Sequence, residues 1–328
     1  MGSLTHTNGS AVVRIGDTAA VCGVRAEVLH TDDIASWSVS RSATTATNEG
    51  DDLDRQSYIN EFNLLVPNLS LSTGCAAGFI PNAPPSTLAQ SLSYQILSLL
   101  NSSRLVGEQD LTIWYQRPDL SVGEAHNESE RMDTDEEEHR VTDASLNERE
   151  IKAFWVLYID VMVISLAGNP FDTAWASVLA ALKDTKLPRA WWDADNETVV
   201  CSDRVDEARQ LSLRGLPVAC SFCVFEADAA AAWRAVVIPD AGELHRTTTR
   251  KDSSQRRRWI LADPDAYEES LSQEKICIVV DKDHRGQTVL HKMDKNGGWN
   301  VERQELRDLV NISSARWDHV RTVLLDRS

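Results

Sequence analysis

The run between Phe154 and Leu166 constrains the fold most, because it is almost continuously apolar and rich in β-branched and aromatic residues. It is shorter than the roughly 20 apolar residues that a membrane-spanning helix needs, and Asp160 interrupts it. Runs of this kind are typical of strands that are covered on both faces of a sheet. We therefore expect a central strand here, with Asp160 paired to a neighbouring chain or loop.

An amphipathic helix is predicted directly after this strand. Asn169 is expected to cap it, Pro170 stands at its first position, and Leu187-Pro188 ends it. Its predicted apolar stripe consists of Phe171, Ala174, Trp175, Val178, Leu179 and Leu182.

Two further helices are predicted from the same apolar period. The first covers 86–103, begins at a Ser/Thr cap, and places Leu88, Leu92, Ile96 and Leu99 on one face. The last begins at about Val301, with Leu306, Val310, Trp317, Val320 and Leu324 on one side. Trp155, Trp175 and Trp317 are expected in core or interface packing.

Strands are predicted before and after these helices. Ser10–Ile15 and Ala19–Val28 alternate on either side of Gly16-Asp17, which indicates a hairpin. Later strands are predicted at Val218–Phe225, Ala235–Ile238, Arg258–Leu261, Lys275–Val280 and Thr288–His291. This order favours an α+β fold, in which mixed sheets are layered with helices.

Charge is concentrated in polar segments between the predicted elements. The segments at about 30–57 and 117–150 are predicted to be disordered insertions, and the second holds twelve acidic against four basic residues. The net charge of −17 argues against a chain that binds nucleic acid over a large part of its own surface, because phosphate binding needs clustered Lys and Arg. One basic loop, at about 245–258, is a candidate contact for RNA or for an acidic partner, and the alternative is a loop that is simply solvated. Its basic residues are Arg246, Arg250, Lys251, Arg256, Arg257 and Arg258.

Six cysteines without a secretory leader favour a reducing compartment, so we expect a nuclear or cytosolic protein. Cys220 and Cys223 form a C-x-x-C, but residues three apart on a strand point to opposite faces. They are therefore predicted to be core cysteines, and no metal site is expected.

Several strings, in the same order along the chain, resemble the RNase PH family. Residues 9–18 with 22–27 match its opening hairpin, and 157–164, Gly168-Asn169 and 180–188 resemble the exosome ring subunits in particular. Shorter matches are at 216–219, at 262–264 with Glu268-Glu269, and at Gly297-Gly298. The resemblance implies an RNase PH fold, with an N-terminal part at 1–190 and a C-terminal part at 191–328.

Family members that are active use phosphate to attack RNA, so they need N–H donors, cations and a carboxyl group around that anion. Their phosphate loop resembles D-G-G-x-R or G-S-R, whereas the matching places here are Asn169, Pro170, Phe171 and Asp172. Pro170 lacks an N–H and Asp172 would repel phosphate. The resemblance therefore implies a degenerate phosphate loop.

A second departure concerns the carboxylates, because Glu269 and Lys275 stand where active members carry two acidic residues. In the partner class of archaeal ring subunits, the helix matching 86–103 lends arginines to the neighbour's RNA site. Ser98 and Asn101 stand at those places here. No catalytic residue and no cofactor is therefore expected.

The resemblance implies a non-catalytic subunit of the RNA exosome ring, found in the nucleus, the nucleolus and also the cytoplasm. Its partners would be other RNase PH-like subunits, cap proteins with OB and KH modules, a catalytic exoribonuclease, and RNA in the ring channel. Two alternatives stay open, an active phosphate-dependent 3′–5′ exoribonuclease and a stand-alone binding module. A phosphorolysis assay tests the first alternative, and co-purification with other proteins tests the second.

Overall fold

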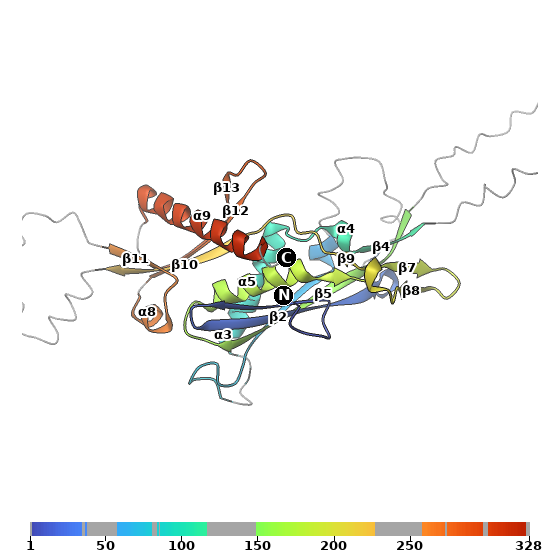
Figure 1. Cartoon of the computed structure of the whole chain (residues 1–328), viewed down its shortest axis with the longest axis horizontal. Coiled ribbons are helices and arrows are strands. Elements are labelled where there is room, and N and C mark those ends of the chain that lie inside the picture. The colour runs from blue at the N-terminus through green and yellow to red at the C-terminus, as the bar shows by residue number, and fades with distance from the viewer. Residues whose placement is uncertain are drawn as a thin grey trace, which may run out of the picture.

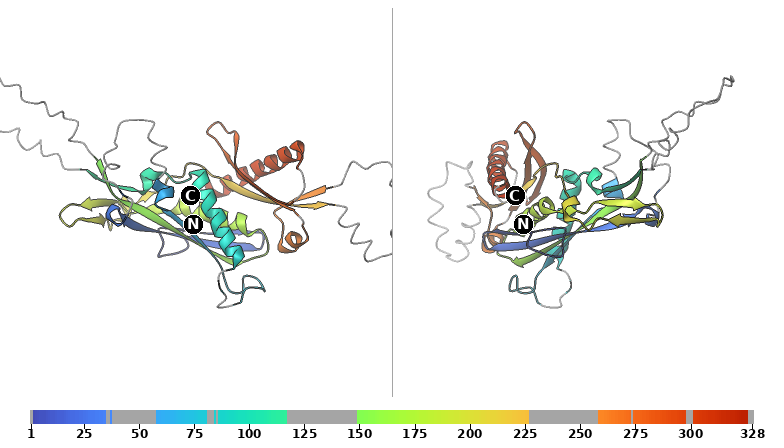
Figure 2. Two further views of the ribbon diagram at one scale, coloured as in Figure 1. Left: turned by 180° about the vertical axis from the view of Figure 1, so that it is seen from behind. Right: turned by 45° about the vertical axis from the view of Figure 1, so that its right-hand side comes forward.

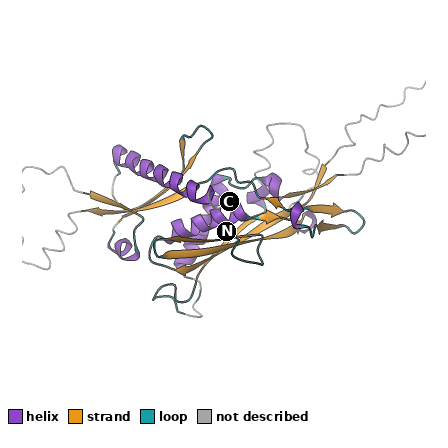
Figure 3. Ribbon diagram, viewed as in Figure 1, coloured by secondary structure: helices purple, strands orange, loops and turns teal. Residues whose placement is uncertain are grey.

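A computed structural model describes residues 2–34, 37, 58–80, 84, 86–116, 149–226, 258–272, 274–297 and 301–325. Two larger sheets are layered with helices, so the predicted α+β fold is confirmed (Figures 1 and 3). The predicted strand at 235–238, and most of the segments at 30–57, 117–150 and 245–258, lie outside the described residues. The predicted division at residue 190 stays a prediction.

The first sheet has the order β1-β2-β5-β3, with β4 also paired to β5. All its pairs are antiparallel except β3 with β5. The predicted hairpin is confirmed, because Ile15 pairs with Thr18 around Gly16, whose φ of +57° suits glycine. The strands are β1 (Gly9–Ile15), β2 (Thr18–His30), β3 (Leu65–Leu71), β4 (Thr112–Gln116) and β5 (Arg149–Ser165).

Strand β5 is central, as predicted, but it begins at Arg149 and one of its faces is only partly covered. Met162 and Ile164 are 50% and 49% exposed, so the expectation that both faces are covered is wrong at that end. Asp160 was expected to pair with another chain or a loop. It pairs instead within the sheet, 3.6 Å from the guanidinium of Arg25 on β2.

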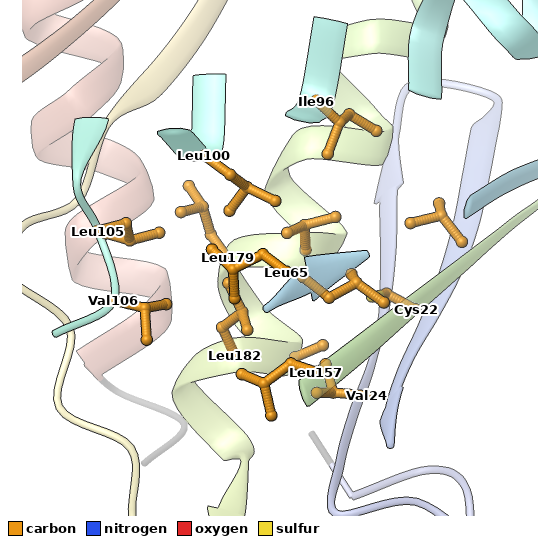
Figure 4. Close-up of a cluster of buried hydrophobic side chains, with 14 of the residues drawn as sticks. Cys22, Val24, Leu65, Ile96, Leu100, Leu105, Val106, Leu157, Leu179 and Leu182 are labelled. Atoms are coloured by element: carbon orange, nitrogen blue, oxygen red, sulfur yellow. The ribbon is translucent and has the colours of Figure 1, made fainter. Parts of the chain in front are cut away.

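Helix α3 (Thr87–Ser103) covers the other face of the first sheet. The predicted cap is confirmed, since the Ala89 N–H donates to Ser86 Oγ at 3.1 Å. Leu92, Ile96 and Leu99 are buried, but Leu88 is 39% exposed and was wrongly assigned to the apolar face. Figure 4 shows Ile96 and Leu100 of this helix in the core with side chains from α5 and the sheet.

Helix α5 (Pro170–Asp184) contacts β1, β2 and β5 of the first sheet and β10 of the second. Because it is covered from both sides, it is buried nearly all round rather than along the predicted stripe alone. The indole N–H of Trp175 donates to the Pro217 carbonyl at 2.6 Å. The helix ends at Asp184, before the predicted Leu187-Pro188, because the Thr185 side chain and backbone turn back onto the last carbonyls.

The second sheet has the order β11-β10-β12-β13, and Figure 2 shows α9 and α8 on opposite sides of it. Helix α9 buries Leu309 and Trp317 against the sheet, in a core separate from the first. The indole N–H of Trp317 donates to Leu216 O at 2.7 Å, and the side chain is buried, so the predicted core packing of Trp317 is confirmed. The elements are β10 (Val218–Glu226), β11 (Arg258–Ala262), α8 (Ala266–Leu271), β12 (Glu274–Lys282), β13 (Thr288–Asn296) and α9 (Arg303–Leu325).

Short elements connect the larger helices and strands. They are η1 (Thr31–Asp33), α4 (Glu108–Leu111), β6 (Lys186–Leu187), β7 (Ala190–Asp193), β8 (Thr198–Cys201), η4 (Val205–Glu207) and β9 (Arg209–Gln210). The two ends of the described chain meet beside α5, where Gly2 N–H donates to Asp184 and Lys183 donates to the Leu324 carbonyl. Figure 1 shows both ends at the centre of the molecule.

The two cysteines of the C-x-x-C are buried on opposite faces of β10, as predicted. Cys220 packs in the core under α9 and hydrogen-bonds Ser313, whereas Cys223 hydrogen-bonds Ser272 after α8. Burial raises the pKa of Cys220 to about 12.

In the described ranges, no three His, Cys, Asp or Glu side chains are grouped to hold a metal ion. None of the described helices has the length and apolar character to cross a membrane.

Candidate functional site

Most of the predicted degenerate active-site residues lie at the turn between β5 and α5 or at the start of α5. This turn is held in a specific conformation. Gly168 has a φ of +113°, and a β-carbon there would lie 2.5 Å from Ala266 N. The Thr18 hydroxyl donates to Gly168 O at 2.6 Å and accepts from Ala167 N at 3.0 Å. The turn is therefore fixed by the hairpin on one side and by the start of α8 on the other.

A carboxylate of the chain itself occupies the start of α5. The backbone N–H of Asn169 donates to Glu269 Oε1 at 3.3 Å, and Lys275 Nζ lies 3.4 Å from the other oxygen. Helix N-termini attract anions through free N–H groups and the helix dipole. Glu269 of α8 therefore accepts the Asn169 N–H, which is a donor that an external anion would need. Pro170, the first residue of the helix, contributes no N–H.

The side chain of Asn169 does not cap α5, although Asn169 is the N-cap residue. Its amide donates instead to Asp172 Oδ2 at 2.9 Å and to Asp263 Oδ1 at 2.6 Å. The predicted N-cap position of Asn169 is confirmed, but its side chain makes no cap hydrogen bond, because its left-handed backbone, with φ of 44°, belongs to the turn. Asn169 thus ties the helix to the end of the second sheet.

Asp172 is buried beneath the turn, where it accepts hydrogen bonds from Ser221 N at 2.9 Å and Ser221 Oγ at 2.8 Å. Arg316 of α9 lies 3.6 Å from the same carboxylate and 4.0 Å from Asp263. Burial raises the pKa of Asp172, while Arg316, Asn169 and Ser221 oppose that shift. Asp172 therefore faces the interior, and its predicted repulsion of phosphate stays a prediction.

The structure thus brings together five of the six residues that the resemblance assigned to the degenerate active site. Asn169, Pro170, Asp172, Glu269 and Lys275 form one cluster, which we call the turn cluster together with Asp263, Ser221 and Arg316. Phe171 turns into the core and is 8% exposed.

Three carboxylates face two cations in the turn cluster, and each cation lies within 4.0 Å of a carboxylate. Sequence reasoning missed Arg316, because nothing local signals that α9 returns to the start of α5. The only hint is its position beside Trp317, a core residue.

The other candidate residues belong to the basic loop at about 245–258. Arg246, Arg250, Lys251, Arg256 and Arg257 lie outside the described residues. Arg258 begins β11 and pairs with Glu226 in the sheet register. The RNA or partner contact predicted for this loop stays a prediction.

Comparison with known proteins identifies the family of the chain. Residues 1–188 match the family model of the 3′ exoribonuclease family, domain 1. The chain therefore belongs to the RNase PH family, and the resemblance seen in the sequence is confirmed.

Among curated proteins, the chain is similar to the exosome complex component rrp43 of Schizosaccharomyces pombe. The two are 27% identical over 314 residues, which are 96% of this chain and 80% of the relative. It is also 20% identical over 171 residues to the exosome complex component Rrp42 of Thermococcus gammatolerans, covering 52% of this chain and 49% of that protein.

Solved structures show the same fold. An Archaeoglobus fulgidus exosome with RNA bound to the active site matches with a TM-score of 0.54 at 18% identity, over 98% of this chain and 85% of that one. An archaeal exosome core matches with a TM-score of 0.53 at 16% identity, over 98% of this chain and 83% of that one.

Proposed function

We propose that the chain is a non-catalytic ring subunit of an RNA exosome, supporting 3′–5′ RNA processing and decay. The likeness to the exosome component rrp43 extends over 96% of the chain, so it supports a role for the whole molecule. The expected role is architectural, with the subunit forming part of an RNA channel and a docking surface.

One observation carries the non-catalytic part of the proposal. Glu269 accepts the Asn169 N–H at the start of α5, which is the place that the family resemblance assigns to phosphate. Phosphorolysis brings a phosphate ion against the RNA linkage, so it needs unpaired donors and cations. In the turn cluster Lys275 is committed to Glu269, and Arg316 to Asp172 and Asp263.

The partners in this proposal are other RNase PH-like subunits, cap proteins with OB and KH modules, and a separate catalytic exoribonuclease. RNA would pass through the ring without being cut by this chain. The nucleus and nucleolus, with some cytoplasmic protein, are the proposed locations, since RNA maturation and turnover occur there.

A phosphorolysis assay tests the missing catalysis. Purified chain is incubated with single-stranded RNA and inorganic phosphate, and released nucleoside diphosphates are measured. The proposal expects no release above a protein-free blank. Phosphate-dependent release that Asp263→Asn abolishes would establish the alternative, an active exoribonuclease.

Affinity purification under native conditions tests the ring assignment. The tagged chain is isolated and the mass of the intact assembly is measured. The proposal expects an assembly with several other proteins of similar size. Recovery of the tagged chain as a monomer under the same conditions would favour a stand-alone binding module.

A further inference from the structure

A cavity of about 320 Å³ lies between the ends of α5 and α9 and the segment that leads into β10. Pockets that take small ligands or partner side chains occupy roughly 300 to 1,000 Å³. Five bulky apolar side chains line the cavity, with Lys183, Gln210 and Arg321 among its polar lining residues. The apolar side chains are those of Leu211, Leu213, Leu216, Trp317 and Leu324.

The walls of this α5–α9 pocket are held by hydrogen bonds, so the cavity is preformed. Gln210 donates to the Lys183 carbonyl at 2.7 Å, and Lys183 donates to the Leu324 carbonyl at 3.0 Å. The Trp317 indole is fixed by Leu216 O at 2.7 Å and by Asp281 Oδ1 at 3.1 Å. A preformed cavity loses little conformational entropy when a side chain enters it.

The two cations of the pocket are available for an anion. Arg321 stacks over the Trp317 ring at 5.4 Å, and neither Arg321 nor Lys183 forms an ion pair with another described residue. Lys282 provides the contrast, because it lies 5.0 Å from the same ring but is paired with Asp318 at 2.7 Å. In a chain of net charge −17, this pocket is a local place where an acidic group is attracted.

We propose that the α5–α9 pocket binds a segment of a partner protein that inserts a bulky apolar side chain and places a neighbouring carboxylate against Arg321. The apolar lining accounts for the first part of this chemistry, and the unpaired guanidinium for the second. The inference goes beyond the proposed function, because it depends on the pocket alone and not on the turn cluster.

Three acetylated and amidated tetrapeptides test the proposal by titration against the full chain. Their sequences are Gly-Phe-Glu-Gly, Gly-Phe-Gln-Gly and Gly-Ala-Glu-Gly, so they differ by one carboxylate or by one apolar side chain. Binding is followed by NMR of leucine methyl groups, with Leu213 and Leu324 as reporters within the pocket.

The Phe-Glu peptide is expected to bind most tightly. Removing its carboxylate should weaken binding about two- to fivefold, the range for an exposed ion pair. Removing the phenyl group should weaken it at least about tenfold. Arg321→Gln should abolish the difference between the Glu and Gln peptides, whereas the control Arg285→Gln, an exposed arginine on the β12–β13 turn, should preserve it.

Two results of the titration would overturn the proposal. One is the absence of saturable shifts at Leu213 and Leu324. The other is equal affinity of the native chain for the Glu and Gln peptides. Sedimentation provides a further check, because a dimer of the native chain that Arg321→Glu dissociates would assign the pocket to a second copy of this chain instead.

Discussion

Replacing Asp172 with alanine tests whether the turn cluster holds the two sheets and α5 together. The carboxylate accepts two hydrogen bonds from Ser221 and one from Asn169, and it lies 3.6 Å from Arg316. Asp172→Ala leaves the Ser221 N–H without its carboxylate acceptor and leaves Arg316 with only the more distant Asp263. Removing one partner of a buried ion pair costs about 3 to 5 kcal/mol.

Urea denaturation followed by circular dichroism measures this loss. Asp195→Ala is the matched control, because Asp195 is exposed in the β7–β8 turn, and it should change stability by less than about 0.5 kcal/mol. In a double-mutant cycle, Asp172→Asn and Arg316→Met should show a coupling of about 1 to 3 kcal/mol. A loss below about 1 kcal/mol for Asp172→Ala, or strict additivity in the cycle, would refute this account of the turn cluster.

Three further predictions concern the Gly168 turn, the titration of Asp172 and the reactivity of the cysteine thiols. Gly168→Ala should destabilise the chain by about 2 to 4 kcal/mol through backbone strain and overpacking, while Gly78→Ala, where nothing lies within 4 Å, should have little effect; equal thermal shifts would contradict this. Burial raises the pKa of Asp172 above its ordinary value of 3.8, so the native state holds that proton more tightly than the unfolded state. The stability of the native chain relative to Asp172→Asn should then fall as pH rises from about 4 through the raised pKa, and urea midpoints that keep a constant difference from pH 4 to about pH 8 would contradict it. Cys201 is the exposed cysteine, so a thiol reagent should label it first in the folded chain, and fast labelling that survives Cys201→Ser would disprove this.

Local patterns predicted the elements whose signals are local. The hairpin around Gly16 followed from strand alternation, and the helix at 86–103 from its period and its serine cap. Burial around α5 was underestimated because a helix stripe describes one packed face, whereas the second sheet covers the other face too. The exposure of Met162 has the opposite cause, since an apolar strand does not reveal which of its faces lacks a cover.

The turn cluster was predicted in part. The family resemblance singled out Asn169, Asp172, Glu269 and Lys275, and the structure brings them together. The inward direction of Asp172 and the approach of Arg316 could not be predicted, because both depend on how α9 and β10 pack against α5. Long-range packing, rather than residue type, decides which charges neutralise one another.

Binding of inorganic phosphate tests the central claim most directly. Equilibrium dialysis with labelled phosphate is carried out on the native chain and on Arg316→Gln. We predict no saturable binding at about 1 mM phosphate, a level that detects about 4 kcal/mol of binding free energy. Saturable binding below that concentration, lost in Arg316→Gln, would show that the turn cluster accepts an external anion and would contradict the account.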